Sequence, residues 1–418
     1  MSNAETQYFK AITLGHFLSE LPKSTLPASV ASENGAYPFF CSSSVVKYCN
    51  TFIQEKPTVL MGTGGVASVN FGNDKFAYST DTWAFRSNDE EALKTEYIYR
   101  ALRQKLPKID YRAFEGSGLK HLRKKDVKNL LIRVPVNKIV KEKILTIFRD
   151  LDSAIEKTEA LIEKYQQIKA GLMHDLFTRG IGADGKLRPP REQAPELYQE
   201  TPIGWIPKDW GLDILRSVLI ENPTNGIYKS ADLIGEGTLM IGQTAFTKER
   251  SVDFSLCRKG LIDDAEIKHY SVLENNILIT RVFATVNGVG LPTVVPKMYE
   301  PAVFESNMMR LKVNVEKISP LILFEWLRNR KIRNLIVSGA NASNQVSINQ
   351  KVLNKLPVPS IDQTEQLEIS KKIDSVNKAY TFEISKLVKL KQLKSGVMHD
   401  LLTGKVEVTI NSAEVANV

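Results

Sequence analysis

Three stretches of this chain carry residue types whose spacing is typical of chemistry. Glu266-Ile267-Lys268 has the Glu-x-Lys spacing of many metal-dependent nucleases, but no upstream aspartate can be assigned to it. The Gly62–Gly65 loop follows an expected strand, as a nucleotide-binding loop does, yet it lacks the Gly-Lys-Ser/Thr of a P-loop. Asn222–Asn225 lacks the second proline and the aromatic residue with which amino-methyltransferases hold a flipped base. No catalytic residue is predicted, and a nuclease or methyltransferase that uses Glu266 or Gly64 is the alternative.

Histidine and cysteine do not indicate a metal or cofactor site. His174 and His399 each lie beside an apolar helical seam, where we expect them to cap or pack. Cys41, Cys49 and Cys257 cannot form a disulfide framework and do not have zinc-site spacing. We therefore predict that this chain itself binds neither a cofactor nor a metal.

A helix that occurs twice organises the rest of the chain. Lys169–Thr178, with the sequence Lys-Ala-Gly-Leu-Met-His-Asp-Leu-Phe-Thr, returns at Lys394–Thr403 as Lys-Ser-Gly-Val-Met-His-Asp-Leu-Leu-Thr. Upstream of each copy, seam residues alternate steps of three and four, which is the heptad pattern of a coiled coil. The two seams are Phe148, Leu151, Ile155, Thr158, Ile162, Tyr165, Lys169, Leu172 and Leu176, and Ile373, Val376, Tyr380, Glu383, Leu387, Leu390, Lys394, Val397 and Leu401. Two rods of roughly 60 Å, at about 1.5 Å per residue, are expected to pair with each other.

Each rod follows a stretch with the pattern of an α/β domain. Short apolar runs such as Thr58–Met61 and Asn276–Val282 are bounded by turn-forming residues and predict strands. Gly180 and Gly182 are stop signals for the first rod, and the proline-rich residues after it predict an extended linker. The predicted boundaries are 5–136 for the first domain, 137–180 for the first rod, 181–206 for the linker, 207–358 for the second domain, 359–404 for the second rod and 405–418 for a tail.

Composition excludes several classes of protein. The 418 residues suffice for two or three domains, and 43% hydrophobic with 25% charged residues is typical of a soluble globular protein. No apolar run reaches the roughly 18 to 20 residues of a membrane span, so a cytoplasmic location is expected. The net charge of +9 is compatible with a polyanionic partner, and a basic cluster around Lys120, Arg123 and Lys124 could contact phosphates.

With this order of elements, the chain resembles the specificity (S) subunits of type I restriction-modification systems over nearly its whole length. The resemblance rests on the duplicated Lys-x-Gly-x-Met-His-Asp-Leu endings, on Leu356–Val358 before the second rod, on Ile203–Trp210 at the start of the second domain, and on Gly35–Phe39, Gly62–Gly65 and Ser79–Thr82. It implies an α+β fold in which two target recognition domains with mixed β-sheets are joined by two long antiparallel coiled-coil helices, as a pseudo-twofold tandem repeat. The start of the first domain departs from the family by lacking the Gly-Trp-Ile-Pro pattern of the second.

The same resemblance implies a non-catalytic DNA-recognition subunit. Each domain would read one half of a bipartite site on double-stranded DNA, and the rods would dock modification (M) and restriction (R) subunits. S-adenosylmethionine, ATP and magnesium are then expected on those partner subunits. A coiled-coil scaffold without DNA binding is the second alternative to this interpretation.

We choose candidate residues for DNA contact and for partner docking by their residue type and by their expected position on loops or rods. Arg and Lys suit guanine or phosphate, and Asn and Gln suit adenine. The candidates for DNA contact are Ser43, Lys47, Gly64, Gly65, Ser79, Lys120, Arg123, Lys124, Gln243, Arg281, Asn287, Asn307 and Arg310. The candidates for partner docking on the rods are Leu161, Ile168, Met173, His174, Met398 and His399.

Overall fold

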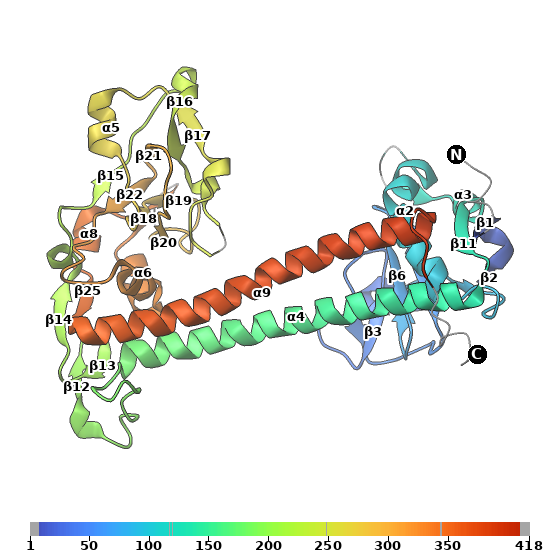
Figure 1. Cartoon of the computed structure of the whole chain (residues 1–418), viewed down its shortest axis with the longest axis horizontal. Helices are drawn as coiled ribbons and strands as arrows, with labels where there is room; N and C mark the ends of the chain where they lie inside the picture. The colour runs from blue at the N-terminus through green and yellow to red at the C-terminus, as the bar shows by residue number, and fades with distance from the viewer. Residues whose placement is uncertain (1–7, 117, 119, 248, 343–344, 410–418) are drawn as a thin grey trace. The chain divides into compact units, whose positions relative to one another are not determined.

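The structure, a computed structural model, describes residues 8–116, 118, 120–247, 249–342 and 345–409. It divides into two compact units: unit 1 contains the chain up to residue 161 and again from residue 383, and unit 2 contains residues 162–382. Each unit holds one α/β domain and one section of each of two long helices (Figure 1). Within the described residues, we find no helix that is both long and apolar enough to span a membrane.

The long helices are α4 (Lys138–Thr178) and α9 (Gln363–Thr403), each of 41 residues. Every residue of the two predicted seams is buried or half-buried. In unit 1, Asp152 of α4 pairs with Lys394 of α9, and Glu159, further along α4, pairs with Lys391, which is earlier in α9. The helices therefore run antiparallel there, and the seams predicted from the heptad pattern are confirmed.

Glycine ends both long helices. Gly180, two residues after α4, has a φ of 61° and donates its N–H to the carbonyl of Asp175, while Gly404, directly after α9, has a φ of 70°. A side chain rarely adopts this left-handed conformation, which glycine reaches at no steric cost. The predicted stop at Gly180 is confirmed.

The domain of unit 1 has a main core, to which the long helices contribute Phe148 and Leu401, and two smaller apolar clusters that contain Phe40 and Phe39. A four-stranded sheet has the order β2-β8-β5-β6 and a three-stranded sheet the order β4-β3-β7, while β1 pairs with β11 and β9 with β10. The elements are β1 (Phe9–Thr13), η1 (Leu14–Phe17), β2 (Leu18–Glu20), η2 (Ala28–Val30), β3 (Tyr37–Phe40), β4 (Lys47–Cys49), β5 (Thr58–Gly62), β6 (Val69–Gly72), β7 (Ala77–Tyr78), β8 (Thr82–Ser87), α2 (Thr95–Ala113), β9 (Phe114–Glu115), β10 (His121–Leu122), α3 (Lys124–Lys128) and β11 (Leu131–Pro135).

The domain of unit 2 is built in the same way, with Leu176 and Ile373 of the long helices in its core. Its sheets have the orders β15-β22-β18-β20, β17-β16-β21 and β19-β24-β23, and β14 pairs with β25. The elements are β14 (Gly211–Ile214), η4 (Leu215–Val218), β15 (Thr224–Asn225), η5 (Ala231–Leu233), β16 (Ile234–Ile241), η6 (Gln243–Ala245), η7 (Phe254–Leu256), β17 (Arg258–Gly260), α5 (Asp264–Tyr270), β18 (Ile277–Thr280), β19 (Val282–Phe283), β20 (Pro292–Val294), β21 (Ala302–Phe304), β22 (Met308–Leu311), α6 (Pro320–Arg328), α7 (Arg330–Ser338), β23 (Asn341–Ala342), β24 (Val346–Ser347), α8 (Gln350–Asn354) and β25 (Pro357–Ser360).

The two domains share one topology, which confirms the predicted tandem repeat. The four-stranded sheets correspond strand by strand, and in each three-stranded sheet one pair, β3/β7 or β16/β21, is parallel. The register pairs Phe40–Tyr78 and Gly62–Thr82 of the first domain correspond to Ile241–Phe304 and Thr280–Met308 of the second. This correspondence locates equivalent loops in domains whose sequences have diverged.

Residues 181–206 are not the extended linker that the prolines predicted. Gly182 donates to the carbonyl of Lys186 at 2.8 Å, a 3-10 helix η3 covers Pro195–Leu197, and β12 (Tyr198–Thr201) pairs with β13 (Gly204–Pro207). Proline fixes its own φ, and here it stiffens turns and strand ends instead of holding an open chain. The segment is an ordered part of unit 2, so the prediction of an extended linker is wrong.

A charged cluster in unit 1 joins α2 to both long helices. Arg100 of α2, which is buried, bonds to Glu96 at 2.9 Å and to Asp152 of α4 at 2.5 Å, and Lys394 of α9 also pairs with Asp152. Burial by itself raises the pKa of Asp152, but the hydrogen bonds from Lys394 and Arg100 outweigh it, so the pKa lies below the usual 3.8.

Asp152→Asn is expected to lower the free energy of unfolding by roughly 1.5 to 3 kcal/mol at pH 7, because it removes the charge from two charge-assisted hydrogen bonds. Since the folded-state pKa is depressed, this contribution is complete above the unfolded-state pKa of about 3.9 and is lost as the pH falls through the folded-state value. Urea unfolding at several pH values measures the difference in the free energy of unfolding between the variant and the wild type. The exposed neighbour Asp150→Asn is the control, and a difference for Asp152→Asn that persists unchanged in acid contradicts the prediction.

Candidate nucleic-acid interface

Loops of the first domain meet beyond the ends of β3 and β5, and we name this surface the first loop face. It comprises residues 41–46, 63–68, 79–82 and 120–122. The N–H of Thr63 donates to the carbonyl of Asp81 at 3.0 Å, and the N–H of Gly65 donates to the carbonyl of Lys120 at 2.9 Å. Gly65 has a φ of 78° and open space where a Cβ would stand. The glycine-rich sequence thus produces a tight loop whose backbone another molecule can approach closely.

The second domain carries the equivalent surface, which we name the second loop face. It comprises the described residues 242–247, 281–291, 305–308 and 345–347. The N–H of Arg281 donates to the carbonyl of Asn307 at 2.7 Å, just as Thr63 does to Asp81. The strand β19 pairs with β24 and thereby attaches the 281–291 loop to the domain.

The two loop faces differ in the side chains that they expose. The first presents Ser44, Val66 and Lys120, whereas the second presents Asn287 and Asn307. Amide side chains can make paired hydrogen bonds to adenine, and a lysine can bind guanine or a phosphate. One architecture therefore carries two different sets of exposed side chains.

The structure brings most of the sequence-predicted DNA contacts together on these faces. Ser43, Gly64, Gly65 and Lys120 lie on the first loop face, and Gln243, Arg281, Asn287 and Asn307 lie on the second. Lys47 is exposed on the adjacent strand β4. Their contact with DNA stays a prediction.

Burial corrects the prediction for Ser79 and Arg310. Ser79 is 0% exposed and shares a 3.1 Å hydrogen bond with Thr82. Arg310 is 2% exposed, donates to Glu221 at 2.9 Å and to the carbonyl of Ser271, and is therefore a structural part of β22. Neither side chain can reach a DNA base, because the protein itself encloses it.

Arg123 and Lys124 are exposed but already hold acidic partners. Arg123 pairs with Glu115 at 2.8 Å and Asp126 at 2.6 Å, and Lys124 pairs with Glu20 at 3.2 Å. Hydrogen bonds from Lys128 and then Lys124 lower the pKa of Glu20 despite its partial burial. The basic cluster is thus partly neutralised, which weakens its attraction for phosphates relative to the expectation from sequence.

Neither motif of the enzyme alternative is arranged for chemistry. Glu266 closes a capping box at the start of α5, where it accepts from the N–H of Asp263 and also pairs with Lys229 at 2.6 Å. The Gly62 loop connects the antiparallel strands β5 and β6, so no helix follows it to bind a phosphate. Among the described residues, no group of three or more His, Cys, Asp or Glu side chains could hold a metal.

Five of the six predicted docking residues reach the surface of the long helices. Ile168, His174 and His399 are exposed, and Leu161 and Met173 are half-buried. Met398 is 8% exposed and packs in the core of unit 1, which corrects the prediction for that residue.

Sequence reasoning missed a set of exposed apolar residues on α9. Phe382, Val388 and Leu393 are 66%, 51% and 53% exposed. Each is an immediate neighbour of a seam position, so an apolar residue one step off the heptad seam was the available signal. In unit 2 an open groove of about 1210 Å³ also lies beside the helices, and Met173, Trp205 and Tyr380 are among the residues that line it.

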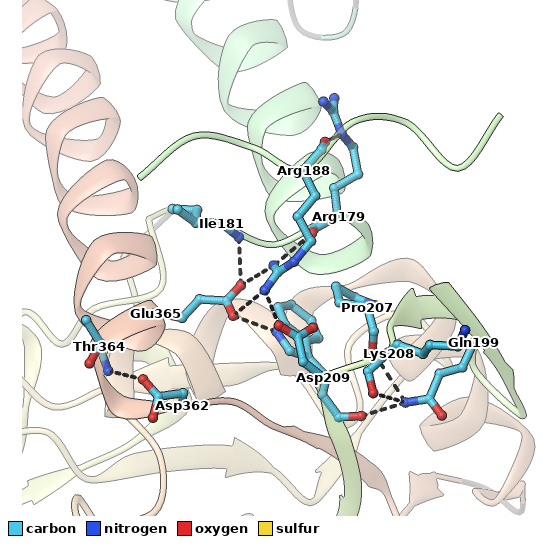
Figure 2. A network of polar contacts seen from close by, with 11 residues as sticks. Arg179, Ile181, Arg188, Gln199, Pro207, Lys208, Asp209, Asp362, Thr364 and Glu365 are labelled. Carbon is cyan, nitrogen blue, oxygen red and sulfur yellow. Dashed lines mark hydrogen bonds and ion pairs between the residues drawn. The ribbon is translucent and has the colours of Figure 1, made fainter. Parts of the chain in front are cut away.

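A polar network that the sequence did not reveal anchors the start of α9 (Figure 2). The Glu365 carboxylate, with a side chain 9% exposed, accepts from Ile181 N at 2.6 Å and from Trp210 Nε1 at 3.0 Å. It also accepts from both terminal nitrogens of Arg188, at 2.6 and 2.9 Å. The hydrogen bond to Glu365 raises the pKa of Arg188, so this guanidinium stays charged. We name Glu365, Arg188, Ile181 and Trp210 the Glu365 clasp.

Comparison with known proteins agrees with this arrangement. Residues 13–167 match the family model described as the type I restriction modification DNA specificity domain. The chain is 23% identical to the type I restriction enzyme MjaVIII specificity subunit of Methanocaldococcus jannaschii, over 96% of this chain and 93% of that protein. It is 21% identical to the EcoDI specificity subunit of Escherichia coli, over 91% and 83% respectively. Its fold is similar to that of the type I restriction-modification S subunit from M. genitalium, with a TM-score of 0.64, 15% identity and coverage of 98% and 99%.

Proposed function

We propose, from the premise that this chain belongs to the family of type I restriction-modification specificity subunits, that its two loop faces read the two halves of a bipartite DNA site. The chain is a DNA target-recognition subunit, and the division of labour between the faces is the proposal. The observation that carries it is the repetition of one loop architecture with different exposed side chains. Each domain would then recognise a different half-site in the same manner.

The exposed apolar residues of the long helices support docking of partner subunits. Ile168, Phe382, Val388 and Leu393 are large apolar side chains that face water unless a partner covers them. We assign this surface, together with the groove in unit 2, to the M and R subunits. Catalysis, S-adenosylmethionine, ATP and magnesium belong to those subunits in this proposal, and the complex works in the cytoplasm.

Mapping of methylated bases in genomic DNA tests the proposal. Cells that contain the M subunit are compared with and without this chain. We expect a motif of two defined segments separated by a gap of unspecified bases, present only when the chain is present.

Two results would count against this function. A complex that assembles but methylates without any motif that depends on this chain would favour the coiled-coil scaffold. A motif that disappears on changing Glu266 or Gly64, with DNA binding and assembly intact, would favour an enzyme in its own right.

A further inference from the structure

The carbonyl of Asp81 collects several hydrogen bonds on the first loop face. It accepts from the N–H of Thr63 at 3.0 Å and from the Thr63 hydroxyl at 2.9 Å. The Ser42 hydroxyl also donates to it. Ser42 Oγ in turn accepts from the N–H of Thr63 at 3.1 Å. One hydroxyl therefore joins three loops, those that contain Ser42, Thr63 and Asp81.

The carbonyl of Asn307 has the same place on the second loop face. It accepts from the N–H of Arg281 at 2.7 Å and from the N–H of Val282 at 3.2 Å. Gln243 Nε2 donates to this carbonyl at 3.2 Å and to the carbonyl of Val282 at 2.9 Å. One amide group again joins three loops.

These two side chains occupy equivalent positions although their chemistry differs. Phe40 and Ile241 correspond in the register of their parallel pairs, so Ser42 and Gln243 are each the second residue after a matched strand end. A hydroxyl and a primary amide share the ability to donate to a carbonyl. Both domains thus have a side-chain hydrogen bond to the equivalent carbonyl, of Asp81 or Asn307, although the donor residue differs.

Their hydrogens are already used inside the protein. The single hydroxyl hydrogen of Ser42 goes to Asp81, and the two amide hydrogens of Gln243 have two carbonyl acceptors. Neither side chain therefore has a hydrogen left to donate to a base. The residues whose carbonyls accept these bonds, Asp81 and Asn307, have exposed side chains. The bonds therefore hold the loop that faces outward.

We propose that Ser42 and Gln243 are positioning residues. Ser42 holds the backbone at Asp81 in place, Gln243 holds the backbone at Asn307, and each thereby sets base discrimination in the half-site that its own domain reads. This inference rests on the proposed function. It assigns to Gln243 an indirect role in place of the direct base contact predicted from sequence. Because a contact loop must be held to within about 0.5 Å for selective recognition, loss of either bond is expected to relax one half-site alone.

The test uses Ser42→Ala and Gln243→Ala in the assembled complex with the M subunit. Methylation rates are measured on duplexes with the motif found for the wild type and with one mismatch in either half. For each variant, we expect the ratio of cognate to mismatched rates to fall roughly three- to tenfold in one half-site, as the loss of the bond to the Asp81 or Asn307 carbonyl alone implies at about 0.5 to 1.5 kcal/mol, and to stay unchanged in the other. The two variants should affect opposite halves.

Matched controls separate positioning from general loosening. Ser19→Ala removes an exposed hydroxyl on β2, and Gln350→Ala removes an amide whose 2.6 Å bond to Pro223 lies outside the loop face. Neither control should alter discrimination. Ser42→Cys retains a weak donor and should recover part of the ratio in the first half-site, which also covers the case that Ser42→Ala folds poorly.

Unchanged ratios for both alanine variants would overturn the inference, as would equal relaxation of both half-sites by either one. The failure of the proposed function looks different. In that case the wild-type chain itself produces no bipartite motif, before any variant is compared.

Discussion

Exchange of residues 211–360 for the matching segment of another specificity subunit is expected to replace one half of the methylated motif and to leave the other half intact. The two domains have separate cores, and each loop face is built within one unit. A wrong base pair costs about 1 to 3 kcal/mol at each position, so several new contacts suffice to abolish the old half-site.

The boundaries of this exchange follow from the structure. Strands β14 and β25 pair from Gly211–Ser360 to Ile214–Pro357, and a cut inside this ribbon, as at the sequence-based limit 358, would separate paired residues. Exchange of 211–360 moves the ribbon as a whole and leaves Trp210 and Glu365 of the clasp in the host chain.

Mapping of methylated bases is the measurement, with the unexchanged chain as reference. A hybrid that assembles and changes both halves of the motif would contradict independent reading by the two domains. A hybrid that retains the original motif would show that residues 211–360 do not read DNA.

Glu365→Ala is expected to destabilise unit 2 by roughly 3 to 5 kcal/mol, the cost of breaking a buried ion pair. The Arg188 side chain is only 10% exposed, and without Glu365 its remaining carboxylate partner is the more exposed Asp209 at 2.6 Å. The N–H of Ile181 and the Trp210 indole would also lose their acceptor. A buried charge left with one exposed carboxylate, and two buried donors left without their acceptor, explain the size of the effect.

Tryptophan fluorescence during urea unfolding measures this change, since Trp205, Trp210 and Trp326 all lie in unit 2. Asp362→Ala is the matched control, because Asp362 caps the same helix through an exposed bond to the N–H of Thr364 at 2.8 Å. The control should destabilise the protein much less. An effect of Glu365→Ala no larger than that of Asp362→Ala would show that the clasp does not anchor α9.

Local sequence patterns predicted the two long helices and the end of α4. The heptad seams and the repeated Met173-His174-Asp175 and Met398-His399-Asp400 triplets predicted two paired helices, and all seam residues are indeed buried or half-buried. Gly180 predicted the end of α4. Such features follow from sequence because helix periodicity and helix stops depend on residues within a few turns of one another.

The candidate DNA and docking contacts were predicted only in part, because the type of a residue does not determine whether its side chain is buried. Arg310 and Asn307 are three residues apart and both suit base contacts, yet Arg310 is 2% exposed and Asn307 faces solvent. Met398 has the same sequence context as Met173 but is buried in the core of unit 1. In each case the deciding neighbours are distant in the sequence.

By itself, then, the sequence determined the repeat, the pairing of the long helices and the resemblance to specificity subunits, since each of these depends on spacing along one chain. Only the tertiary structure decided which polar groups are free to meet DNA. Glu365 meets Arg188 across 177 residues and Ser42 meets Asp81 across 39. Hydrogen bonds over such separations depend on how strands and loops are brought together in space, and no local pattern records them.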